Sequence, residues 1–191
     1  MILGIDPGQS GAWALLSEVG HVIGFGELPF IRDQKVAWCD GRRLTSAIVE
    51  AVCHADMTMA RGIDAFIERA QAMPKQGVSS SFVYGVGFGS VLAAVQMLPA
   101  AIRLVHPGVW KRHFALQSDK RGSLDLARLR YPAMPLERKK DHGLAEALLI
   151  ATYGFEQFRL GRSAPAQMPL RSNVNRQPMY AGDPDAAPVS E

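Results

Sequence analysis

In the stretch MILGIDPGQSGA, residues 1–12, an apolar segment of five residues is followed by a charged residue. Residues 1–5 have the composition of a buried strand, and Asp6 follows at once, ahead of the turn residues Pro7 and Gly8. A carboxylate at the end of a buried strand is costly to desolvate unless a partner compensates its charge. The position of Asp6 therefore raises the question of what this carboxylate binds.

The composition is that of one globular domain. The chain has 191 residues, of which 48% are hydrophobic, and its net charge of +3 is only a weak indication of nucleic-acid binding. Cys39 and Cys53 form neither a CxxC pair nor a disulfide framework, which indicates a reducing, cytoplasmic compartment. We find no charge-free apolar run of about 18 residues and therefore predict no membrane span.

Three short apolar segments at hairpin spacing open the chain and predict an antiparallel meander. Two later strands, each preceded by a helix, extend it, so the order predicts an α/β fold with a mixed five-stranded sheet flanked by helices. Strands are expected at 1–5, 12–16, 22–25, 63–67 and 102–105, and helices at 42–54, 82–97, 109–115, 123–130 and 143–158.

The folded domain is expected to span residues 1–160. Residues 161–191 hold five of the twelve prolines and lack apolar periodicity. This composition predicts a disordered C-terminal tail.

A second predicted strand also ends on an acid, because Glu68 closes the segment AFIE at 65–68. If the two strands are neighbours, Asp6 and Glu68 meet at one edge of the sheet, where each raises the pKa of the other. A third acid, Glu146, lies in the largely apolar last helix, with Asp141 and His142 near its start. Mg²⁺ prefers carboxylate oxygens, so the pattern predicts a magnesium site at this edge.

Each of these residues also has an ordinary structural role open to it. Acids at strand ends cap turns or pair with arginines, and acids on helices cap them or form salt bridges. The ordinary roles are turn capping for Asp6, pairing with Arg61 or Arg69 for Glu68, N-capping for Asp141, a structural or exposed position for His142 and a helix salt bridge for Glu146.

In three segments, in the same order, the chain resembles the RuvC family of Holliday junction resolvases, which belongs to the RNase H-like superfamily. The stretch ILGIDPGQSGAWALL at 2–16 is similar to the family's first strand and turn, and LAEALLIATYG at 144–154 to its last helix. Between them, AFIERAQAMPKQGVSSSFVYGVGFGSVLAAV at 65–95 resembles its second motif. The resemblance implies an RNase H-like sheet over residues 1–154.

The resemblance also implies a catalytic role for five residues and two bound Mg²⁺ ions, with Mn²⁺ able to substitute. Where the family carries an acid or histidine three residues before the last acid, this chain has Gly143, so Asp141 or His142 is the nearest substitute as fourth ligand. The implied metal ligands are Asp6, Glu68, Glu146 and either Asp141 or His142, and Lys120 is similar to a basic residue near the scissile phosphate.

The implied activity is structure-selective, two-metal hydrolysis of phosphodiester bonds in branched DNA by a homodimer, with no nucleotide cofactor. Basic clusters near the site would bind flanking phosphates, although each taken alone also fits a solvated helix face. The expected DNA-binding residues are Lys111, Arg112, Lys120, Arg121, Lys139 and Lys140.

Two other functions fit parts of the pattern. A branched-DNA-binding protein with a decayed metal site is compatible with Gly143 and with the lack of an aromatic residue from Arg69 to Ser81. An actin-like or sugar-kinase-like ATPase shares the first motif, but the chain is short for that two-lobed fold and lacks a second glycine-rich phosphate loop.

Overall fold

The computed structural model describes residues 1–33, 36–57, 59, 62–71, 77–117 and 120–161. Its main sheet has the strand order β3-β2-β1-β6-β7. The first three strands pair antiparallel, and β6 and β7 continue parallel to β1. The mixed five-stranded sheet predicted from the sequence is confirmed, whereas the predicted tail lies, except for Gly161, outside the described residues. The strands are β1 (Ile2–Asp6), β2 (Ala12–Leu16), β3 (Val22–Glu27), β6 (Ile63–Glu68) and β7 (Ala100–Val105).

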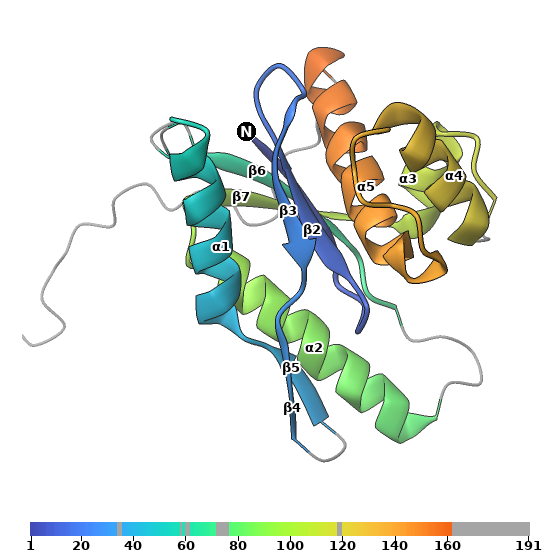
Figure 1. Cartoon of the computed structure of the whole chain (residues 1–191). Helices are drawn as coiled ribbons and strands as arrows, with labels where there is room; N and C mark the ends of the chain where they lie inside the picture. Colours follow the sequence, from blue (N-terminus) through green and yellow to red (C-terminus); the bar gives the residue numbers. More distant parts are fainter. Residues whose placement is uncertain (34–35, 58, 60–61, 72–76, 118–119, 162–191) are drawn as a thin grey trace, which may run out of the picture.

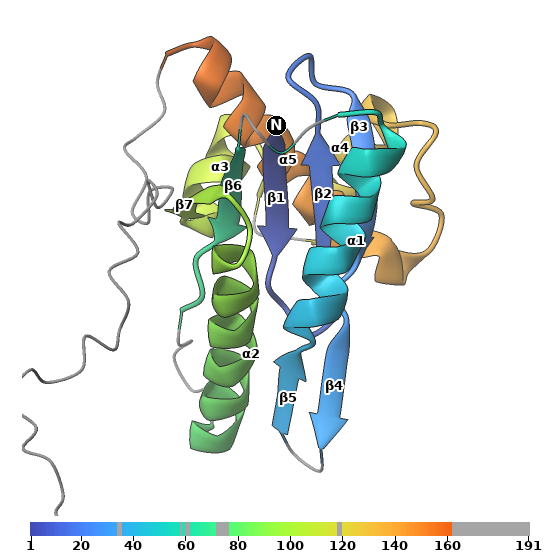
Figure 2. The same ribbon diagram turned by 90° about the vertical axis from the view of Figure 1, so that its left-hand side faces the viewer.

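Helices cover both faces of this sheet (Figures 1 and 2). One face packs against α1 (Gly41–His54) and α2 (Val78–Gln96), and the other against α3 (Pro107–His113), α4 (Lys120–Arg130) and α5 (His142–Arg159). Because side chains alternate along a strand, Leu3 and Ile5 enter the core under α1 and α2, while Ile2 enters the core under α5. Asp6 therefore lies on the α5 face.

The contact between β1 and α5 is unusually close at Gly4. A Cβ atom added at Gly4 would collide with backbone atoms of Ala147 and Ala151 on α5. Farther along the same helix, a Cβ at Gly154 would lie 2.5 Å from the ring of Phe66 on β6. Glycine at these points lets the helix lie directly on the centre of the sheet, which fixes the depth of every α5 side chain.

A second sheet was not predicted from the sequence. It is the hairpin of β4 (Phe30–Asp33) and β5 (Val36–Cys39), which extends past the edge of the main sheet alongside α2 (Figure 2). The backbone N–H of Cys39 donates to Ser90 Oγ of α2 at 2.7 Å. Both strands have four residues, too short for a clear alternation, so tertiary packing on α2 stabilises them rather than local pattern.

The helix α2 differs from the sequence prediction in two ways. It begins at Val78 rather than residue 82. It is also long and apolar enough to cross a membrane, by length and composition only, and about a fifth of it is buried. The expectation that no such charge-free run exists was therefore wrong. In the structure α2 packs against β5, α1 and β7.

We expect Gly4→Ala to destabilise the protein by about 3 kcal/mol, because the added methyl must displace the α5 backbone. Gly89→Ala is the control, since Gly89 lies inside α2 and no atom of the described residues is within 4 Å of the added atom. That substitution should stabilise by roughly 0.5–1 kcal/mol through helix propensity. Urea unfolding followed by circular dichroism measures both, and equal effects would contradict the packing argument.

Candidate active site

The sheet brings Asp6 and Glu68 side by side. The parallel pairing of β1 with β6 places Gly4 beside Phe66 and Ile5 beside Ile67, so the strand-end acids form the next pair. Phe66 belongs to the core under α5, and alternation sends Glu68 to the same face. Asp6 is 9% exposed, and its Oδ1 accepts a hydrogen bond of 3.0 Å from the Gly8 N–H. The turn-capping role open to Asp6 is thus realised, on the face where α5 lies.

Glu146 reaches this region from α5. It is 5% exposed, and its Oε1 accepts hydrogen bonds from Lys111 Nζ at 2.9 Å and from Ser123 Oγ at 3.3 Å. The salt bridge of Glu146 is therefore made with a lysine of α3, not within its own helix. Burial of a carboxylate is costly, and the pairing with Lys111 offsets part of that cost.

Glu68 is bound by Trp110, the residue before Lys111 on α3. Its indole N–H donates to Glu68 Oε2 at 2.8 Å, and the Trp110 side chain is fully buried. Burial and then the charge of Asp6 raise the pKa of Glu68 from 4.5 to about 7, with a further increase from Glu146. The Trp110 hydrogen bond and Lys111 oppose this rise. The charge of Glu68 is therefore repelled by both Asp6 and Glu146.

The negative charges of Asp6 and Glu68 also affect a side chain of α2. Burial, then Glu68 and Asp6, raise the pKa of Tyr84 on that helix. A phenol that senses both strand-end carboxylates lies near the same sheet edge. Tyr84 therefore borders the site from the α2 side.

In the structure, the carboxylates of Asp6, Glu68 and Glu146 do not form a complete set of metal ligands. Within the described ranges, no three His, Cys, Asp or Glu side chains are close enough together to hold a metal ion. Glu68 and Glu146 are directed instead to Trp110 and Lys111. The residue types and the mutual repulsion of the carboxylates fit a divalent cation, which would relieve that repulsion.

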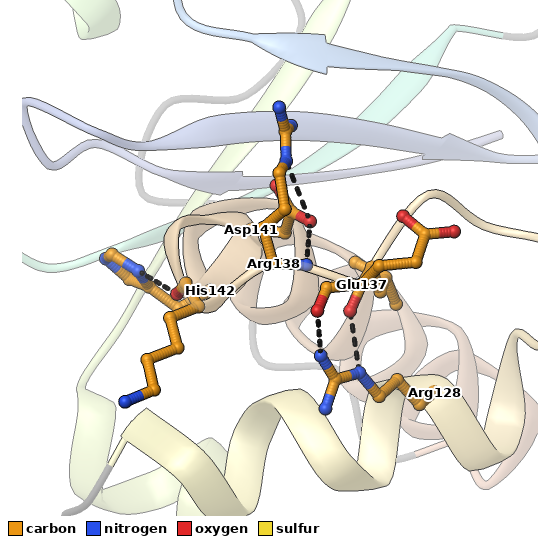
Figure 3. A network of polar contacts seen from close by, with 7 residues as sticks. Arg128, Glu137, Arg138, Asp141 and His142 are labelled. Atoms are coloured by element: carbon orange, nitrogen blue, oxygen red, sulfur yellow. Dashed lines mark hydrogen bonds and ion pairs between the residues drawn. The ribbon is translucent and has the colours of Figure 1, made fainter.

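The two candidates for a fourth ligand have other partners. Asp141, which is 6% exposed, accepts hydrogen bonds from the guanidinium and the backbone N–H of Arg138, and these bonds lower its pKa. His142 lies 3.3 Å from Ser10 Oγ through Nε2 and 3.2 Å from the Lys139 carbonyl through Nδ1. Figure 3 shows both side chains on the segment that leads into α5.

Close packing explains why position 143 is a glycine. A Cβ atom at this position would collide with the Ser10 carbonyl oxygen and approach Gly11 Cα to 3.2 Å. The start of α5 therefore packs directly on the turn between β1 and β2. A ligand side chain at position 143 would require that turn to move.

The predicted DNA-binding residues surround this region unevenly. Lys111 is held against Glu146, whereas the other members whose side chains are described are exposed. Arg121 forms a 3.8 Å ion pair with Asp125 and is 89% exposed. Lys120 begins α4, and its side chain lies outside the described part of the structure. The exposed members are Arg112, Arg121, Lys139 and Lys140.

A mixed sheet of this strand order, flanked by helices and ending in acids at β1 and β6 with a third acid on the last helix, is an RNase H-like fold. Comparison with solved structures finds Thermus thermophilus RuvC in complex with a Holliday junction substrate, at a TM-score of 0.57 and 17% identity. A second T. thermophilus RuvC structure matches at a TM-score of 0.53 and 16% identity. Each alignment covers 86% of this chain and 98% of the matched chain.

The fold is thus similar to that of T. thermophilus RuvC, and the resemblance to RuvC predicted from the sequence is confirmed at the level of the fold. No protein-family model and no curated protein matches the sequence. The likeness therefore lies in the fold and in the order of its motifs.

Sequence reasoning missed the contacts made by α3. Lys111 was expected to contact phosphates, but it binds Glu146, and its neighbour Trp110 binds Glu68. One signal was present, since a tryptophan is seldom buried without a partner for its N–H. The partner itself depends on how α3 packs on the sheet, which periodicity does not show.

Glu68→Gln should raise the stability of the metal-free protein at pH 8 by about 1–3 kcal/mol. The folded-state pKa near 7 exceeds the ordinary 4.5, so the native state loses stability as pH rises between these values, and glutamine removes that loss. The gain should vanish near pH 4. Thermal melts at both pH values measure it.

The exposed Glu50→Gln is the matched control and should leave both melting temperatures unchanged. Addition of Mg²⁺ should stabilise the wild-type protein and not the Glu68→Gln variant. Equal melting temperatures of Glu68→Gln and wild type at pH 8 would contradict the charge repulsion inferred for the three acids.

Proposed function

We propose that this protein is a metal-dependent, structure-selective endonuclease that cleaves phosphodiester bonds in branched DNA, such as Holliday junctions or related forks. The observation that carries the proposal is the coupling of Asp6, Glu68 and Glu146 at one edge of a RuvC-like sheet. The T. thermophilus protein of the same fold is described with a Holliday junction substrate. Three repelling carboxylates are suited to hold cations beside a phosphate.

In this proposal Asp6, Glu68 and Glu146 hold Mg²⁺, for which Mn²⁺ substitutes, and Asp141 or His142 supplies the fourth ligand. Two bound ions would activate a water and neutralise charge on the phosphodiester. Asp6 is central because β1 lies between β2 and β6. Trp110 and Lys111 bind Glu68 and Glu146, and a cation would take over these carboxylates from the two side chains. The protein contributes mainly position and charge.

The proposal extends to binding and assembly. Exposed Arg112, Arg121, Lys139 and Lys140 would contact phosphates that flank the cleaved bond, which makes binding strongly dependent on salt. A four-way junction has two-fold symmetry, and a homodimer with equivalent sites matches it. We place this activity in the cytoplasm, where recombination and repair intermediates form, without a nucleotide cofactor.

A branched-DNA-binding protein without cleavage is the second candidate, and a specific observation favours it. Lys111 already neutralises Glu146, and Gly143 removes a side chain at the position where the family carries a ligand. If Lys111 stays paired with Glu146, this carboxylate only balances the charge of the lysine, and the site binds no metal ion.

Labelled four-way junction, fork and linear duplex, incubated with Mg²⁺ or EDTA, separate these candidates. We expect cleavage of branched DNA in Mg²⁺, with a loss of about a hundredfold or more in Asp6→Asn, because the central carboxylate is removed. Asp33→Asn is the control, an exposed aspartate that also ends a strand. Product appearance on denaturing gels gives the rates.

Tight binding of the junction without cleavage in Mg²⁺ or Mn²⁺ would overturn the nuclease proposal and support the binding protein. Asp141→Asn and His142→Ala in the same assay identify the fourth ligand, since that residue's loss should raise the Mg²⁺ concentration needed for half-maximal rate. Sedimentation equilibrium of the 20.8 kDa chain with and without junction tests the homodimer.

A further inference from the structure

Beside the candidate acids lies a cavity of about 380 Å³, and Asp141, one of the two candidates for the fourth ligand, lies on its wall. This volume falls within the roughly 300–1,000 Å³ typical of small-molecule sites. The turn between β1 and β2, the end of β3 and the segment before α5 form its walls. The side chains that matter below are Gln9, Phe25, Glu27, Arg138, Lys140 and Asp141.

The cavity opens on the same face and edge of the sheet as Asp6. Strand pairing places Ala12 opposite Asp6 on one side and opposite Glu27 on the other. Directly paired residues have their side chains on one face, so Glu27 follows Asp6 after two strand spacings, roughly 10 Å. A DNA strand whose cleaved phosphate lies at Asp6 can therefore place a neighbouring nucleotide over this cavity.

Phe25 supplies an aromatic surface there. It is paired with Ala14, which lies in the core under α5, so the ring is on the α5 face. Phe25 is nevertheless 39% exposed, while Ala14 is fully buried. An exposed aromatic ring on the wall of a cavity is the kind of surface on which nucleobases stack.

Arg138 also lines the cavity, and its side chain is held in place. Its Nε and Nη2 donate to Asp141 Oδ1 at 3.0 and 2.8 Å, and its backbone N–H donates to Asp141 Oδ2 at 2.7 Å. Arg128 holds the same segment by donating to the carbonyls of Leu136 and Glu137 at 2.6 and 2.8 Å (Figure 3). The guanidinium is thus preorganised although its side chain is 60% exposed.

The charge of the lining favours a neutral guest. Arg138 and Lys140 are balanced by Glu27 and Asp141, so the cavity does not favour a phosphate. Gln9 adds an amide group, whose Oε1 accepts a 3.3 Å hydrogen bond from Arg32 on β4. An aromatic face with hydrogen-bonding groups around it and no net charge matches a nucleobase.

We propose that this cavity binds one unstacked nucleobase of the DNA strand next to the cleaved phosphate, with its ring on Phe25 and its edge toward Gln9 and Glu27. The inference rests on the proposed action on branched DNA and adds a base-binding site to it. Such a site makes cleavage depend on the base at one position and favours a branch point, where bases unstack at low cost.

The test uses four-way junctions that carry 2-aminopurine at successive positions around the branch, bound by the full chain in EDTA so that no cleavage occurs. One position should change in fluorescence on binding, and Phe25→Ala should abolish that change and weaken affinity about tenfold. Phe25→Tyr should restore both. Phe158→Ala is the matched control, since Phe158 is 37% exposed near the opposite end of the sheet.

Each outcome decides one claim. Junction binding with identical fluorescence changes in wild type and Phe25→Ala would overturn the base site and leave the proposed nuclease intact. Loss of the signal in Phe158→Ala as well would indicate a general folding effect and also reject the site. Absence of junction binding by the wild-type chain, measured by anisotropy, would remove the proposed function and the base site together.

Discussion

The close contact of α5 with β1 sets the geometry of the whole site. With glycine at position 4, the backbone of α5 lies against the strand at Ala147 and Ala151. That contact lowers Glu146 to the level of the strand ends, where Asp6 and Glu68 are neighbours. Gly143 allows the same close approach one turn earlier, against Ser10. The acids are therefore assembled by backbone packing, and their electrostatic repulsion is a cost that the core must offset.

Much of this architecture follows from local pattern. The apolar segments that end in Asp6 and Glu68 predict both strands and the meeting of their acids at one edge, because parallel neighbours end together. The last helix and the position of Glu146 within it follow from the largely apolar composition of that segment. The hairpin of β4 and β5 does not, because its four-residue strands are stabilised by α2. The helices α2 and α3 begin at Val78 and Pro107, earlier than predicted, because propensity defines helix ends poorly.

The side chains around the acids were harder to predict than the acids. Lys111 has the appearance of a phosphate ligand in the sequence, and only the packing of α3 shows that it contacts Glu146. Asp141 and His142 are adjacent in the chain but have separate partners, Arg138 for one and Ser10 with Lys139 for the other. Periodicity gives the face on which a residue lies, whereas the choice of partner depends on contacts between elements distant in sequence.

The short helix α3 has a mechanical consequence. Its adjacent residues Trp110 and Lys111 hold carboxylates from two different elements, a strand and a helix. A displacement of α3 therefore weakens a contact of Glu68 and a contact of Glu146 at the same time. A ligand that competes with Trp110 and Lys111 for these two carboxylates therefore favours a displaced α3. By thermodynamic reciprocity, a contact that shifts α3 changes the affinity for that ligand by the same factor.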